Sequence, residues 1–279
     1  MAISNFIPTV WSTTLYKELD GKYIAVKHCN RDFEGDIKSK GSTVKICGVG
    51  DVTVFDYTKN TDMTAPQTLS DSAQTLTINK AKAFNFQIDD VDRAQAMPRL
   101  MQQAMRRAAS ALASDADSYI FGLVGDATTA NTVTETAPTS DNVIDALMKA
   151  RTILSKSGVT DASDMVFEVS PEIAELILKA KIKLATDNES ALENGCIGNI
   201  CGVKVYVSNN VVKTAGENSK VIHKCVARSK RAVAYAEQLS EIEAYRPEKR
   251  FADAVKGLHL YGAKLIYPNE YVALHFTLA

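Results

Sequence analysis

The clearest pattern of apolar and polar positions in this chain covers residues 98–123. At 100° per residue, the apolar side chains gather on one face of a helix and the polar ones on the other. Pro98 suits a first helical turn, and no proline or glycine follows before Gly122. The sequence therefore predicts one helix of about 39 Å, at 1.5 Å per residue. The apolar face holds Leu100, Met101, Ala104, Met105, Ala108, Leu112, Tyr119 and Leu123, and the polar face Arg99, Gln102, Gln103, Arg106, Arg107, Ser110, Ser114 and Asp117.

Asp115 is the exception on this helix, because its angle places a carboxylate beside Ala104, Ala108 and Leu112. An unpaired buried carboxylate costs several kcal/mol. We therefore expect an arginine, a lysine or backbone N–H groups within hydrogen-bond distance of Asp115.

Strand-like alternation precedes the long helix in two blocks, at residues 43–46 with 52–54 and at residues 74–78 with 84–88. Between the blocks, residues 58–72 are polar and have little to bury. This arrangement predicts an extended two-stranded hairpin with a loop at its tip. Such a hairpin is marginally stable alone and needs a surface to lie on.

After the long helix the pattern becomes mixed. Residues 126–138 are interpreted as a surface loop, residues 142–157 as a helix stopped by Gly158, and residues 165–169 as a strand. Ser170 and Pro171 then begin a helix to about residue 182. Residues 195–208 follow as a hairpin, with strands near Val221 and Ala232. The strands at 258–266 and 271–278 have no sheet of their own, so we expect them to pair with strands before the long helix. The fold class is α+β.

Composition limits the classes of function. The chain has 279 residues with 46% apolar and 23% charged residues, which is ordinary for a globular protein. Its net charge of −1 argues against attracting nucleic acid by its own field. No apolar run reaches the roughly 18 residues of a membrane span, so we expect no membrane partner. The first eleven residues lack the basic start of a signal peptide. Their apolar side chains should pack on this chain or a neighbour: Phe6, Ile7, Val10 and Trp11.

Candidate chemistry is sparse. The five cysteines include no C-x-x-C pair and are interpreted as buried thiols. Cys196 and Cys201 could form half of a zinc site, but nothing nearby completes it. Gly48 and Gly50 lack the third glycine of a phosphate loop. The four histidines are scattered without a positioned partner, so we expect no catalysis, metal or cofactor. From composition alone, Arg99, Arg106 and Arg107 are more simply a solvated face than a phosphate-contacting stripe.

Several segments, in order, resemble the major capsid (coat) proteins of tailed bacteriophages. Near the start these are NFIPTVWS at 5–12, NRDFEGDI at 30–37 and GSTVKI at 41–46. FNFQIDDVD at 84–92 leads into the long helix, and EAYRPEKRFAD at 243–253 is followed by KGLHLYGAK at 256–264. The resemblance spans nearly the whole chain, and the order and spacing of the segments carry it.

The resemblance implies the tailed-phage major capsid fold. Residues 1–32 would be the N-terminal arm and 33–73 the extended loop. Residues 74–124 and 246–279 would form the peripheral domain with the spine helix 98–123, and 125–245 the axial domain. The arm residues Phe6, Ile7, Val10 and Trp11 would contact neighbouring subunits, and Arg99, Arg106 and Arg107 would face DNA.

As a major capsid protein, the chain would self-assemble through hexamers and pentamers into an icosahedral head. Expected partners are a separate scaffolding protein, a portal protein and packaged double-stranded DNA in weak, non-specific contact, with a decoration protein as an optional further partner. The location would be the virion capsid, assembled in the cytoplasm of the host bacterium. Two alternatives are a shell protein of a cellular nanocompartment with the same fold, and an α+β enzyme or ligand-binding domain.

Overall fold

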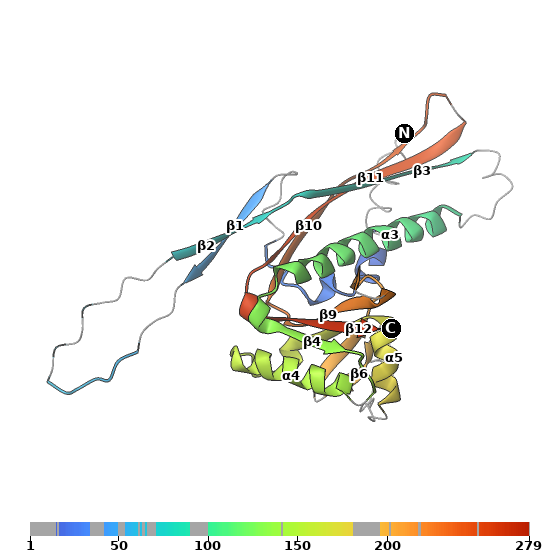
Figure 1. Ribbon diagram of the computed structural model, residues 1–279. Coiled ribbons are helices and arrows are strands. Elements are labelled where there is room, and N and C mark those ends of the chain that lie inside the picture. Colours follow the sequence, from blue (N-terminus) through green and yellow to red (C-terminus); the bar gives the residue numbers. More distant parts are fainter. Residues whose placement is uncertain are drawn as a thin grey trace.

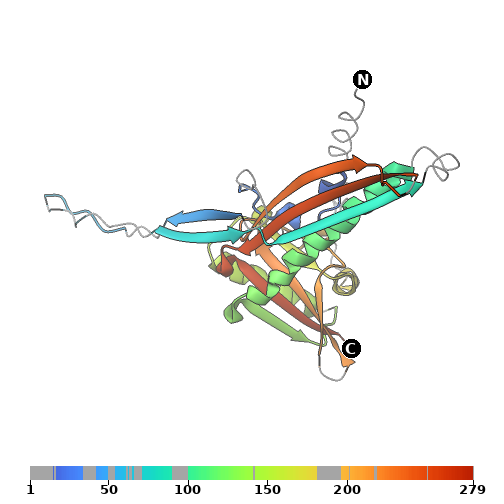
Figure 2. The same ribbon diagram turned by 90° about the horizontal axis from the view of Figure 1, so that it is seen from above.

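The computed structural model describes residues 15, 17–33, 42–49, 54–60, 62, 65, 71–89, 100–140, 142–180, 196–200, 202–216, 219–249 and 251–278. These residues form an elongated sheet with a long helix along it, a compact lobe beneath, and a hairpin that projects from the body (Figure 1). Viewed from above, the hairpin and the far end of the elongated sheet point in opposite directions (Figure 2).

The long helix, α3 (Leu100–Gly122), confirms the helix predicted from the apolar pattern. It lies along an antiparallel sheet with the order β10-β11-β3. The buried side chains of α3 include Met105, Ala109, Leu112, Ala113, Ala116 and Ile120. Phe84 and Phe86 of β3 stack at a centroid distance of 6.0 Å and pack beside Met105. The sheet consists of β3 (Lys80–Asp89), β10 (Val233–Tyr245) and β11 (Ala252–Leu265).

The compact lobe is built on a seven-stranded sheet with the order β4-β12-β9-β5-β7-β6, in which β8 also pairs with β9. Two amphipathic helices, α4 (Asn142–Lys156) and α5 (Pro171–Lys179), confirm those expected from the sequence. α4 is followed by Gly158, whose φ of 91° suits glycine. The strands are β4 (Thr132–Thr136), β5 (Met165–Val169), β6 (Cys196–Ile200), β7 (Val203–Val207), β8 (Val212–Ala215), β9 (Val221–Ser229) and β12 (Tyr271–Leu278). Short 3-10 turns are η1 (Val26–His28), η3 (Leu123–Asp126), η4 (Thr129–Asn131), η5 (Ala162–Asp164) and η8 (Pro268–Glu270).

Three sequence-based assignments are corrected by the sheets. β11 pairs with β3 as expected, but β12 lies between β9 and β4 in the compact lobe and not beside strands that precede α3. β10 pairs with β11, so residues 125–245 contribute to both sheets, as do residues 246–279. The expected surface loop at 126–138 includes β4, which runs parallel to β12. Its run of threonines did not show the apolar alternation that marks a buried strand.

The predicted hairpin is confirmed as β1 (Thr43–Val49) paired antiparallel with β2 (Asp71–Thr77). Val54 lies outside any strand, so the strand expected at 52–54 does not extend to it. At the base, side chains of both strands and of Ile78, which follows β2, form one buried cluster with residues of β10 and β11 and with Ile266, which follows β11: Val44, Ile46, Leu76, Ile78, Ala234, Ala236, Leu260 and Ile266. Gly262 of β11 permits this close approach, because a Cβ atom there would collide with the Thr77 carbonyl oxygen.

Part of the expected N-terminal arm, residues 1–32, is packed into the folded subunit. Leu15, Leu19, Tyr23, Ala25 and Val26 are buried in the body of their own subunit. Residues 17–33 therefore belong to the folded subunit, and the arm residues Phe6, Ile7, Val10 and Trp11 lie outside the described residues. None of the helices in the described ranges is long and apolar enough to cross a bilayer.

Candidate assembly surfaces

The segment 23–31 connects the N-terminal region to the body through three carboxylates. The first is the buried side chain of Glu237, on β10. Tyr23 and Tyr235 donate hydroxyl hydrogen bonds to its Oε2 atom at 2.5 and 2.9 Å, and His259 Nε2 lies 2.9 Å from the same atom. Arg31 Nη2 donates to Oε1 at 2.5 Å. Burial alone disfavours the charged form, but the hydrogen bonds of His259 and Tyr23 hold the pKa of Glu237 below its usual range.

The second carboxylate, Asp117 on α3, corrects the helical wheel. The sequence placed Asp117 on the polar face, yet its side chain is fully buried. Its oxygens accept the backbone N–H groups of Ile24, Ala25 and Val26 at 3.0, 2.9 and 3.0 Å. These groups include the first N–H of η1, which has no partner within its own turn. Burial raises the pKa of Asp117 to about 6.

The third carboxylate, Glu168 on β5, forms a buried ion pair with Arg228 on β9. Arg228 binds it through two hydrogen bonds, Nε to Oε2 at 3.0 Å and Nη2 to Oε1 at 2.8 Å. Its remaining donors reach the carbonyl oxygens of His28 at 3.0 Å and Ala25 at 2.8 Å. Although burial disfavours the carboxylate, the Arg228 guanidinium holds the pKa of Glu168 below its usual value. The segment is thus joined to α3, to the elongated sheet and to the compact lobe.

Asp115 of α3 confirms the expectation of a partner. Lys82 Nζ lies 3.0 Å from its Oδ1 atom, and the Tyr261 hydroxyl donates to Oδ2. Both partners come from the elongated sheet, and the carboxylate is half-exposed at the rim of the contact. Burial opposes ionisation, but the hydrogen bonds from Tyr261 and Lys82 hold the pKa of Asp115 below its usual value.

The polar face of α3 carries two of the three arginines singled out in the sequence. Arg106 and Arg107 are exposed, and Arg99 lies outside the described residues. Arg106 Nε donates to Glu18 Oε1 at 3.0 Å, yet 56% of the Arg106 side chain remains accessible. An exposed pair of this kind contributes little to stability. The face therefore keeps accessible positive charge, partly balanced by Glu18.

Large apolar side chains are exposed where the molecule projects. Val54 is 90% exposed and Tyr57 69% exposed in the loop of the β1–β2 hairpin. At the opposite end, Phe251 precedes β11 and is 82% exposed. A monomeric protein scatters single apolar groups such as Phe251, whereas several exposed apolar side chains in one projecting loop are typical of contacts with other subunits.

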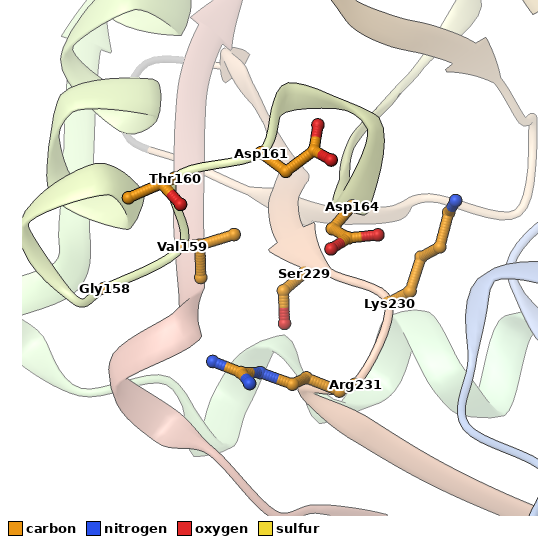
Figure 3. A pocket seen from close by; sticks show the side chains of 8 residues that line it. All are labelled: Gly158, Val159, Thr160, Asp161, Asp164, Ser229, Lys230 and Arg231. Carbon is orange, nitrogen blue, oxygen red and sulfur yellow. The ribbon is translucent and has the colours of Figure 1, made fainter.

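No catalytic arrangement emerges from the described parts of the chain, and no group of three or more His, Cys, Asp or Glu there could hold a metal ion. Cys196 is buried and free, and Cys201 lies outside the described residues. One cavity of about 360 Å³ lies between the loop that follows α4 and the turn between β9 and β10 (Figure 3). At this cavity Arg231 pairs with Glu270 at 2.6 Å, and Ser229 donates to Glu270 at 2.6 Å. These polar groups satisfy one another and leave no activated nucleophile.

A model of the family described as phage capsid protein matches residues 72–274, which is more than half of the chain. The chain belongs to the phage capsid protein family. A comparison with curated protein sequences finds no significant match. As a capsid protein it is a structural, non-enzymatic component of a virion shell, and it functions as an oligomer.

Solved structures agree with this family. One from Mycobacterium phage Che8 is 32% identical, with a TM-score of 0.67 and 90% of each chain covered. The capsid of Ralstonia phage GP4 is 11% identical, with a TM-score of 0.71, covering 94% of this chain and 91% of that one. A virus-like particle from Pyrococcus furiosus is 12% identical, with a TM-score of 0.57, covering 96% and 99%. The last two likenesses concern the fold alone. The expected tailed-phage capsid fold is confirmed.

The Glu237 cluster yields a prediction about pH. In unassembled subunits at pH 7, Glu237→Gln should lower the free energy of unfolding by about 3–5 kcal/mol, because it breaks a buried charged network. A carboxylate with a lowered folded-state pKa stabilises the fold above its unfolded-state pKa, about 4.3, and loses that contribution as pH falls further. The difference between wild type and variant should therefore narrow below about pH 4.3.

Denaturant titrations at several pH values measure this difference. Glu243→Gln is the matched control, since Glu243 makes an exposed pair with Lys256 and should change stability by less than about 1 kcal/mol. A Glu237→Gln deficit that stays constant down to pH 3.5 would contradict the assignment.

Proposed function

We propose that this capsid protein is the major capsid protein of a tailed bacteriophage. It assembles through hexamers and pentamers into an icosahedral head that encloses double-stranded DNA. The observation that carries the proposal is the β1–β2 hairpin, which leaves the body with exposed apolar side chains at 54–57. A two-stranded hairpin with such a loop needs a surface, and a second copy of the chain offers one.

Sequence identity favours a phage head over the shell of a cellular nanocompartment. The 32% identity to the Che8 phage structure extends over 90% of both chains. The head would assemble in the host cytoplasm with a scaffolding protein and a portal protein, and a decoration protein could bind its exterior. The elongated sheet with α3 would form the peripheral part, and the compact lobe would point toward the hexamer and pentamer centres.

The first test concerns the role of the N-terminal arm in assembly. Phe6, Ile7, Val10 and Trp11 are proposed to bind neighbouring subunits, and burial of each such side chain contributes about 1.5–3 kcal/mol. Deletion of residues 2–12 should leave a folded, soluble subunit that does not close shells, while the full chain forms closed particles in electron micrographs. Normal particles from the truncated chain would overturn the role of the arm, and the absence of particles from the full chain co-expressed with its scaffolding protein would overturn the proposed function.

Docking of the hairpin loop predicts a difference in hydrogen exchange. Backbone amides at 54–60, which are in no strand of the isolated subunit, should exchange fast in free subunits and at least about tenfold more slowly in particles. Mass spectrometry of peptides from both states measures the rates. Peptides of α4, buried in the compact lobe, are the internal control and should change little. Equal protection of 54–60 in both states would refute the docking.

The arginine face of α3 is proposed to meet packaged DNA through phosphates only, because arginine forks match phosphate oxygens. Replacing Arg99, Arg106 and Arg107 by glutamine should leave assembly largely intact and make filled heads lose DNA more readily at low salt, where charge contacts are strongest. Agarose gels of heads held at low salt measure how much DNA the heads retain. Arg106→Gln alone removes one of the three charges and should cause a smaller loss of DNA. Unchanged retention would leave these residues as a solvated face.

A further inference from the structure

The projecting hairpin is joined to the elongated sheet by a joint of two residues. β2 ends at Thr77 and β3 begins at Lys80, so only Ile78 and Asn79 separate the strand of the hairpin from the strand of the body. From this joint, β2 and β3 extend in opposite directions (Figure 2). A rotation at these two residues would change the angle between the hairpin and the body without breaking either strand.

Backbone meets backbone beside this joint, at Gly262 of β11. Leu260, Gly262 and Lys264 share the face of β11 that the hairpin base covers, because side chains alternate along a strand. A Cβ atom at position 262 would collide with the Thr77 carbonyl oxygen and would lie 3.1 Å from the Ile78 Cα atom. The φ of Gly262 is not in the left-handed region, so close approach and not backbone conformation requires glycine here.

Two side-chain hydrogen bonds continue this contact along β2. Lys264 Nζ donates to the Thr75 carbonyl oxygen at 2.9 Å, and Gln74 Nε2 donates to the Ile266 carbonyl oxygen at 3.1 Å. Both bonds are directional, and the charged donor makes the first of them strong. Together with Gly262 they form the base contact (Gly262, Lys264 and Gln74), which follows β2 over several residues. It therefore fixes the direction of the hairpin as well as its position.

The joint itself is bound to the body as well. The Tyr119 hydroxyl of α3 donates to Asn79 Oδ1 at 3.2 Å, and Lys80 Nζ lies 5.0 Å from the centroid of the Tyr119 ring. Ile78 is fully buried in the cluster at the hairpin base. Because both joint residues are held in place, the base contact acts on a fixed pivot.

We propose that the base contact sets the angle of the hairpin and, through this angle, the curvature of the shell. A neighbour that binds the hairpin takes its orientation from the hairpin, and the rotation between identical subunits decides how an assembly closes. Gly262, Lys264 and Gln74 are thus positioning residues for assembly, although they lie in the interior of one subunit. This inference rests on the proposed docking of the hairpin on a neighbour and names the residues on which the diameter of the shell depends.

Two variants alter the base contact in different ways. Gly262→Ala adds a Cβ atom that backbone atoms of β2 must move to accommodate. The double variant Lys264→Met, Gln74→Met removes both hydrogen-bond donors and keeps unbranched side chains of similar length. Gly125→Ala is the matched control for the first variant, because nothing lies within 4 Å of a Cβ atom added there. Lys149→Met, which removes an exposed ion pair of the compact lobe, is the control for the second.

Hydrogen exchange in free subunits measures the base contact without assembly. A two-stranded hairpin is marginally stable alone, so the pairing of β1 with β2 depends on its attachment to the body. Backbone amides of β2 should exchange about tenfold faster in the double variant than in the wild type, while amides of α4 should not change. Wild-type exchange rates in β2 would overturn the proposal, and an equal acceleration in α4 would contradict a local role.

Electron microscopy of particles assembled with the scaffolding protein measures the curvature. The wild type and both controls should give particles of one diameter, whereas Gly262→Ala and the double variant should give a shifted diameter, several diameters or shells that do not close. The double variant decides where Gly262→Ala does not fold. Double-variant particles with only the wild-type diameter overturn the link to curvature while the proposed function stands. A wild-type chain that forms no particles under these conditions overturns both.

Discussion

The fold depends on how the segment 23–31 is fixed. This short stretch has little regular structure, so its polar groups need partners from elsewhere. Asp117 binds three of its N–H groups, Arg228 binds two of its carbonyl oxygens, and Glu237 binds its tyrosine and arginine side chains. Each partner comes from a different part of the body. The segment therefore aligns α3, the elongated sheet and the compact lobe with one another.

Buried charges are weak evidence for stability, because desolvation offsets much of their attraction. Here the geometry matters more than the net energy. Arg228 can satisfy Glu168 and two carbonyl oxygens only when the segment crosses the lobe at one position. An apolar contact tolerates sliding, whereas a set of directional hydrogen bonds does not. The networks thus specify one arrangement for the chain just before the hairpin begins.

Sequence patterns predicted the elements whose signals are local. α3, α4 and α5 follow from apolar periodicity and from proline and glycine at their ends, and the β1–β2 hairpin follows from alternation on either side of a polar stretch. The resemblance to phage capsid proteins predicted how these elements combine into one fold.

Asp117 was misplaced because a helical wheel shows the direction of a side chain but not which segment packs against the helix, and its partners lie more than 90 residues earlier. Arg228 and Glu168 carry no local signal, since 60 residues separate them. The position of β12 was missed for the same reason.

The segment 23–31 must be fixed because it precedes the long, projecting β1–β2 hairpin. Seven residues in each strand give the hairpin a paired length of about 23 Å at about 3.3 Å per residue. A rotation of about 10° at its base would move the end of the paired region by about 4 Å, more than one residue along a strand. The proposed docking of the hairpin on a neighbour would be lost at that displacement. The Gly262 contact with β2 limits rotation on one side, and the Glu237 network holds the chain on the other. Under the proposed function, rigid internal polar contacts and a projecting apolar loop are therefore two parts of one requirement, that a subunit orient its hairpin before a neighbour is present to bind it.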